Sequence, residues 1–158
     1  SLDYEAHFAL IEGDERTTSA LDKRFRLEFY RPHIAVLTNL TWTESTGHTS
    51  LDAYYDMFNS FSQSIEREGK LIYFDGDEAV RQLAENVRED ITAMPYNAHE
   101  TEEHDGQVFL KTRYGEFPVK VRDAYFLTNM NAARLVCRQL GVKDSEFYQA
   151  ISDYSLSL

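Results

Sequence analysis

The sequence predicts an α/β fold with a mainly parallel sheet, helices on the faces of that sheet and a β-hairpin in the C-terminal third. The first observation is a set of short apolar runs without alternation, which is typical of strands buried on both faces. The second is the order of the elements, because strands alternate with amphipathic helices as in parallel α/β sheets. The expected strands are Phe8–Ile11, Ile34–Leu37, Leu71–Phe74 and Ile91–Tyr96.

Two helices are expected between these strands. Apolar side chains recur at three- and four-residue steps from Leu51, which predicts a helix that stops at Gly69. We expect Phe58 and Phe61, in the middle of this apolar stripe, to be buried under the sheet. Asp77 is placed to cap a second helix, whose apolar face consists of Val80, Leu83, Ala84 and Val87.

The C-terminal third begins with a polar segment, residues 97–106, which contains His99, His104 and four acids. We interpret this segment as a mobile acidic loop, with metal ligation by the histidines as the alternative. A β-hairpin and two helices with a glycine stop between them are expected to follow. Their ranges are Gln107–Thr112 and Phe117–Val121 for the strands, and Leu127–Leu140 and Asp144–Tyr154 for the helices.

The composition disfavours several classes of protein. The chain has 158 residues, of which 42% are hydrophobic, enough for one domain with a sizeable core. Its net charge of -11 disfavours nucleic acid or an anionic membrane as a partner. The single cysteine, Cys137, cannot form an internal disulfide, and no apolar run reaches the length of a membrane span. We therefore expect a soluble domain of a reducing compartment, the cytoplasm.

Acidic residues follow the first and third expected strands. Glu12 and Glu15 come after Ile11, and Asp75 and Asp77 come after the third strand. Ligands bind at the carboxyl ends of strands in open α/β sheets, so a cation site formed by these four acids is one interpretation. Solvated acidic loops after core strands are the other, and both stay open. The 158 residues contain no phosphate-binding Gly-x-x-x-x-Gly-Lys-Ser/Thr loop, no Gly-x-Gly-x-x-Gly and no zinc-binding motif.

Four segments follow one another in a recognisable order: Ile11–Glu15 with Asp22-Lys23, Tyr30–Leu40, Leu71–Glu78 and Thr128–Ala133. In this order they resemble the central domain of the Mur ligases, the ATP-dependent amide-forming enzymes of peptidoglycan synthesis. Within the family, the pattern looks most like the branch of murein tripeptide ligases and UDP-N-acetylmuramate–alanine ligases. Because the resemblance covers nearly the whole chain, residues 1–158 are expected to be a single central-domain-like segment, excised from a longer multidomain chain.

The resemblance implies binding of ATP and Mg²⁺, phosphorylation of a substrate carboxylate, and attack of an amine on the acyl phosphate. Glu12 falls on the family's metal-binding glutamate, and Glu15 is the second candidate. Asn129 falls on the second asparagine of the family's Gly-x-His-Asn-x-x-Asn helix start, which implies nucleotide binding. The implied partners are a UDP-N-acetylmuramyl substrate, ATP, and flanking N- and C-terminal Mur domains.

The sequence departs from the family pattern at several site positions. Glu44 stands where the family has a metal-binding histidine, and if magnesium is used we expect Glu44 to replace that histidine as a ligand opposite Glu12. The family's His-Asn pair falls at Tyr125-Phe126. The lysine that some members carbamylate falls at Tyr55, and the phosphate loop would precede Ser1. The resemblance therefore leaves two functions open: the central domain of a ligase of peptidoglycan synthesis or recycling, or a degenerate Mur-like binding or scaffold domain without ATP use. In both cases we expect the isolated chain to be inactive.

Overall fold

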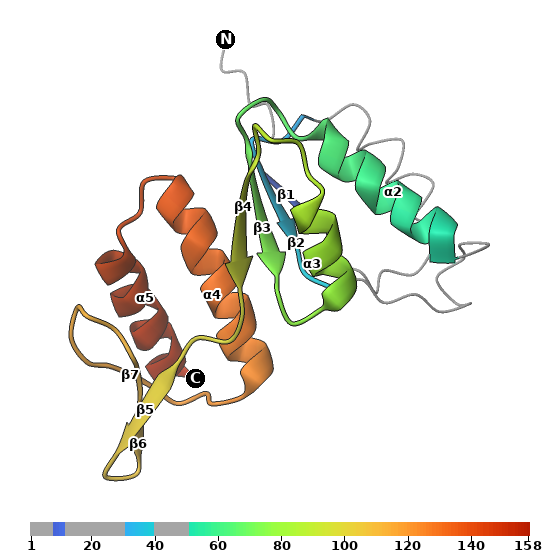
Figure 1. Cartoon of the computed structure of the whole chain (residues 1–158). Coiled ribbons are helices and arrows are strands. Elements are labelled where there is room, and N and C mark those ends of the chain that lie inside the picture. The colour runs from blue at the N-terminus through green and yellow to red at the C-terminus, as the bar shows by residue number, and fades with distance from the viewer. Residues whose placement is uncertain (1–7, 12–30, 40–50) are drawn as a thin grey trace. The chain divides into compact units, whose positions relative to one another are not determined.

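The computed structural model describes residues 8–11, 31–39 and 51–158 (Figure 1). The chain divides into two units, Ser1–Pro95 and Tyr96–Leu158. Where all the described helices lie, in residues 51–158, none has the length and hydrophobicity needed to span a bilayer.

The first unit is built on a sheet with the strand order β1-β2-β3-β4 (Figure 1). These strands lie within one residue of the predicted positions, at Phe8–Ile11, Ile34–Leu37, Lys70–Phe74 and Thr92–Tyr96. β1 pairs with β2, and β2 with β3, in the parallel orientation, which confirms the predicted sheet. Every residue of β2 is buried, as its sequence without alternation predicts.

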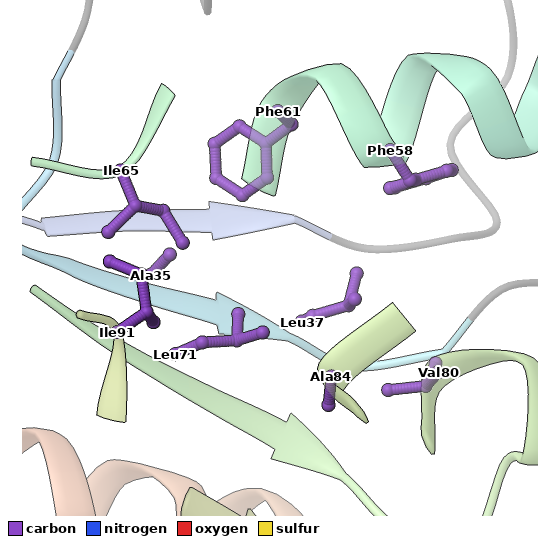
Figure 2. Close-up of a cluster of buried hydrophobic side chains, with 9 residues drawn as sticks. All are labelled: Ala35, Leu37, Phe58, Phe61, Ile65, Leu71, Val80, Ala84 and Ile91. Atoms are coloured by element: carbon purple, nitrogen blue, oxygen red, sulfur yellow. The ribbon is translucent and has the colours of Figure 1, made fainter. Parts of the chain in front are cut away.

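Helices α2 (Leu51–Ser64) and α3 (Glu78–Glu85) pack on one face of this sheet (Figure 2). Phe58 and Phe61 of α2 are each 3% exposed, which confirms their predicted burial. They belong to one cluster with alternate residues of β2 and β3 and with the apolar side of α3. Its buried members are Ala35, Leu37, Phe58, Phe61, Ile65, Leu71, Val80, Ala84 and Ile91.

The end of α2 differs from the prediction. The helix ends at Ser64 and does not continue to Gly69. The hydroxyl groups of Ser62 and Ser64 donate to the carbonyl oxygens of Asn59 and Phe61, at 2.8 and 2.6 Å. The helix ends because the Glu66 N–H donates to the Pro32 carbonyl oxygen at 2.9 Å, not to the Ser62 carbonyl oxygen as in a continuing helix, and because Glu68 has a φ of 58°.

Arg88 forms hydrogen bonds to the end of α2 and to the residue that follows it. Its guanidinium donates to the carbonyl oxygens of Gln63 and Ile65, both at 2.7 Å, and to the Asp90 carboxylate at 3.0 Å. Asp90 also accepts the backbone N–H of Glu68 at 2.9 Å. The hydrogen bonds from Arg88 and from Glu68 lower the pKa of Asp90 to about 2. The pair therefore ties the end of α2 to the segment that leads into β4.

The predicted cap of α3 is confirmed. The Asp77 carboxylate accepts the backbone N–H groups of Ala79 and Val80, at 2.9 and 3.3 Å. Since the first N–H groups of a helix have no partner within the helix, this carboxylate stabilises the start of α3.

The second unit combines an antiparallel sheet of order β5-β6-β7 with two helices. The ranges are β5 Thr101–His104, β6 Gln107–Leu110, β7 Phe117–Val119, α4 Ala124–Gln139 and α5 Asp144–Ser157. The hairpin β6–β7 and both helices confirm the predictions, and Gly141, with a φ of 93°, lies in the predicted stop between the helices. Their shared core consists of Val108, Leu110, Phe117, Val119, Leu127, Met130 and Tyr148.

The interpretation of residues 97–106 as a mobile loop is wrong, because this segment contains β5. Thr101 pairs with Leu110 and His104 with Gln107. Every residue of β5 is exposed, so the strand has no apolar alternation that would predict it. The sequence signal is the dipeptide Asp105-Gly106, whose φ angles of 52° and 76° are typical of the two-residue hairpin turn that Asp-Gly favours.

Candidate functional site

The carboxyl ends of β1, β2 and β3 lie at one edge of the first sheet. The register places Ile11 beside Leu37, and Leu37 beside Tyr73. The polar residues Thr38 and Asn39 follow β2 directly, and the Thr38 hydroxyl donates to the Asn39 side-chain oxygen at 3.2 Å. This edge is where ligands bind in open α/β sheets, so it is the candidate functional site.

The acidic turn after β3 contributes less to this site than its sequence suggests. The Asp77 carboxylate is engaged in the α3 cap, and Asp75 is half-buried. A Cβ at Gly76 would collide with the Phe74 ring, so the backbone of the turn lies directly against that ring. Within the described ranges, no three His, Cys, Asp or Glu side chains are grouped to hold a metal ion.

The three predicted metal ligands, Glu12, Glu15 and Glu44, lie outside the described residues. Their role as ligands therefore stays a prediction. Tyr55, at the position of the family's lysine, is half-buried on α2 and packs against the core of the first unit.

Asn129, the predicted nucleotide-binding residue, is exposed on α4. Tyr125 lies four residues earlier on the same helix and is 78% exposed, so the two residues share one face of α4. Phe126, its neighbour, packs instead against the core of the second unit. Of the two residues at the family's His-Asn positions, the first is thus accessible to a ligand and the second is used for packing.

His99 and His104 do not form a metal site. His104 lies 3.5 Å from the Glu102 carboxylate on the exposed strand β5. His99 bonds to Tyr148 of α5, with its Nε2 2.7 Å from the hydroxyl oxygen. The described residues group neither histidine with two further metal-ligating side chains.

A polar network joins α4 to α5, and the sequence analysis does not predict it. Asp144 accepts hydrogen bonds from Arg138 Nε at 3.1 Å and from Arg134 Nη1 at 2.9 Å, and its side chain is 9% exposed. The hydrogen bond from Arg138, with the charges of both arginines, lowers the pKa of Asp144. Arg134 also donates to Asn131 at 2.9 Å, and its guanidinium lies 5.9 Å from the centroid of the Tyr148 ring.

Residues 3–137 match the family described as Mur ligase middle domain. The UDP-N-acetylmuramate–L-alanine ligase of Arthrobacter sp. (strain FB24) is 30% identical over 156 residues, which cover 92% of this chain and 32% of that protein. The ligase of the same name from Streptomyces coelicolor is 23% identical over 165 residues, covering 96% and 34%. The chain thus spans about a third of the length of these curated relatives.

Solved structures share the fold. MurF from Acinetobacter baumannii superimposes with a TM-score of 0.66 at 14% identity, covering 94% of this chain and 46% of that one. The UDP-N-acetylmuramate:L-alanyl-gamma-D-glutamyl-meso-diaminopimelate ligase from Neisseria meningitides gives 0.62 at 18% identity, covering 80% and 41%. At such identities the likeness concerns the fold alone. With the family match over residues 3–137, it follows that the chain belongs to the Mur ligase middle-domain family.

Proposed function

We propose that this chain is the central domain of an ATP-dependent Mur-type amide ligase, which joins UDP-N-acetylmuramate to an amino acid or peptide in peptidoglycan synthesis or recycling. The observation that carries the proposal is the family match over residues 3–137. That match crosses the boundary between the two units at Pro95. We therefore infer that both units belong to one segment. Because this segment spans about a third of the curated relatives' length, we also propose a longer cytoplasmic chain with flanking N- and C-terminal Mur domains.

The proposed reaction needs a site for phosphates and a cation. ATP phosphorylates the substrate carboxylate, and an amine then displaces the phosphate, which yields an amide, ADP and phosphate. We propose Glu12, Glu15 and Glu44 as ligands of Mg²⁺, which when bound neutralises phosphate charge. Three carboxylates suit this hard cation, which prefers oxygen to imidazole, so Glu44 is a reasonable substitute for the family's histidine.

We propose Asn129 as a nucleotide-binding residue, together with Tyr125. The support is their common exposed face on α4 and the 78% exposure of the Tyr125 ring. A side-chain amide can hydrogen-bond to the edge of a base, and an aromatic ring can stack on its face. Tyr125 thus offers a contact of another kind at a position where the family has histidine.

A degenerate Mur-like binding or scaffold domain without ATP use is the second candidate. Three departures from the family pattern favour it: Glu44 for histidine, Tyr125-Phe126 for His-Asn, and Tyr55 for lysine. The packing of Phe126 against the core of the second unit supports this candidate further, since that position offers no polar group to a ligand.

Thermal unfolding with Mg²⁺ distinguishes the two candidates. If Glu12 and Glu44 face each other, they repel without a cation, and millimolar Mg²⁺ stabilises the folded chain by mass action. At ten times the dissociation constant this amounts to about 1.4 kcal/mol, or a rise of about 4 °C in Tm. We expect the rise in the wild-type chain and its loss in Glu44→Gln.

Asp52→Asn is the matched control, because Asp52 is an exposed acid of α2 outside the proposed ligand set. Its Mg²⁺-dependent rise should equal that of the wild type. If Mg²⁺ leaves the Tm of the wild type unchanged, Glu44 is a solvated residue and the scaffold candidate is favoured.

A further inference from the structure

The imidazole of His99 is held at both nitrogens. Nδ1 lies 2.8 Å from the carbonyl oxygen of Glu100, and Nε2 lies 2.7 Å from the Tyr148 hydroxyl. A carbonyl oxygen only accepts, so Nδ1 carries the proton and Nε2 accepts a hydrogen bond from Tyr148. A proton on Nε2 would reverse this bond, because Nε2 would then donate to the Tyr148 hydroxyl oxygen and the hydroxyl hydrogen would have to point elsewhere.

The surroundings of His99 also favour its neutral form. The Tyr148 ring is 5% exposed and meets the imidazole edge-on, with 5.3 Å between the centroids. Burial, with the charge of Arg134, lowers the pKa of His99 against the opposing effects of the Glu100 carbonyl and of the carboxylates of Glu100 and Asp144.

The charged and titratable groups around this pair come from every neighbouring element of the second unit. Glu100, in the same segment as His99, is paired with Lys111 at 3.5 Å, and Asp144 of α5 is paired with both arginines of α4. The Tyr114 phenol, in the turn between β6 and β7, lies with its ring centroid 6.3 Å from that of Tyr148. A protonated His99 would add a further cation beside Arg134, which these paired acids offset only in part.

The backbone around His99 is bonded to the part of α4 that carries Asn129. The His99 N–H donates to the carbonyl oxygen of Leu127 at 3.2 Å. The Asn131 side chain donates to the carbonyl oxygen of Asn97 at 3.0 Å. These two bonds lie on either side of Asn129 in the sequence. The segment 97–100 therefore joins α5, through the imidazole, to this turn of α4.

We propose that His99 is a positioning residue, which couples its own protonation to the placement of the α4 turn from Leu127 to Asn131. The neutral ring fixes segment 97–100 against Tyr148, and this segment holds the α4 turn through its two bonds. The imidazolium form reverses the bond with Tyr148 and places a second cation near Arg134, which itself bonds to Asn131, and so shifts the turn that presents Asn129. The role of Asn129 as a nucleotide ligand rests on the proposed function, whereas the coupling between His99 and α4 does not.

The coupling has a defined direction with pH. Because the pKa of His99 is lower in the folded chain than the ordinary value of 6.5, the folded state binds fewer protons than the unfolded state. The stabilisation by neutral His99 is complete above pH 6.5 and is lost as the pH falls through the folded-state pKa.

The test is an NMR titration of the 158-residue chain between about pH 8 and about pH 5. Long-range ¹H–¹⁵N spectra should show the Nδ1-protonated tautomer of His99 at neutral pH. The backbone amide shifts of Leu127–Asn131 should then change with the midpoint of His99. His104→Gln is the matched control, because His104 is exposed on β5 and its replacement should leave the pH response of these amides unchanged.

Two variants keep the proposal falsifiable. His99→Gln retains an acceptor that can reach Tyr148 and does not titrate, so the pH response of the α4 amides should be lost. Tyr148→Phe keeps the ring, and at neutral pH it should move these amides toward their positions in the acidified wild type. The proposal is overturned if the amides do not follow His99, or if they respond equally in His99→Gln. Since no nucleotide is present, a failure here is distinct from a failure of the ligase function.

Discussion

Truncation of Phe61 to alanine is expected to destabilise the first unit by about 3–5 kcal/mol. The ring is 3% exposed and packs in the cluster that α2, α3, β2 and β3 enclose (Figure 2). Removing it takes away apolar burial and leaves a cavity that the surrounding side chains fill only partly. Domains are stable by only about 5–15 kcal/mol, so this loss threatens folding.

Urea unfolding followed by far-UV circular dichroism measures the effect on Phe61→Ala. Gln63→Ala is the control, since Gln63 is exposed on the same helix and its truncation should change stability by less than about 0.5 kcal/mol. Equal urea midpoints for Phe61→Ala and the wild type would show that α2 does not pack on the sheet through this face.

Substitution of Gly69 by alanine is expected to cost about 3 kcal/mol. An added Cβ would lie 2.6 Å from Cγ2 of Ile65, 2.8 Å from the Glu66 carbonyl oxygen and 2.9 Å from the His33 carbonyl oxygen. Both oxygens belong to the backbone, and that of His33 accepts the N–H of Lys70 at 2.8 Å at the start of β3. Relief of the clash would therefore require a shift of the chain that pairs β2 with β3.

Gly106→Ala is the matched control for Gly69→Ala. Gly106 has a φ of 76°, and nothing lies within 4 Å of an added Cβ, so its substitution costs only the strain of a left-handed residue, about 1–2 kcal/mol. The free energy of unfolding from urea titrations compares the two variants. If Gly69→Ala were the milder substitution, the close approach of the backbone at Gly69 would be refuted.

The parallel sheet could be predicted because short, contiguous stretches of sequence indicate its strands and helices. The apolar run of β2 is buried throughout, and Asp77 caps α3 as its position before an apolar helix indicates. β5 could not be found in the same way, because its four residues are all exposed and its stability comes from pairing with β6. The Asp105-Gly106 dipeptide is the local signal for that pairing.

The residues of the candidate site could not be predicted from local patterns, because they depend on the family resemblance and on contacts between distant parts of the chain. Asn129 is proposed from the resemblance to the Mur ligases, and the structure adds its common exposed face with Tyr125. The bond between His99 and Tyr148 joins residues 49 positions apart, so no helical or strand period indicates it. Such contacts depend on how α5 packs against the second sheet, which side-chain periodicity alone does not specify.

Amide formation by the longest native polypeptide that contains this chain is the most direct test of the proposed ligase function. The protein is incubated with Mg-ATP, UDP-N-acetylmuramate and an amine, either L-alanine or murein tripeptide, and ADP and the amide product are both quantified. We expect ADP to form only when the UDP-N-acetylmuramyl substrate and a suitable amine are present, with one amide bond for each ADP. Binding of UDP-N-acetylmuramate without ADP formation with either amine would contradict the ligase function and identify the chain as part of a degenerate Mur-like protein.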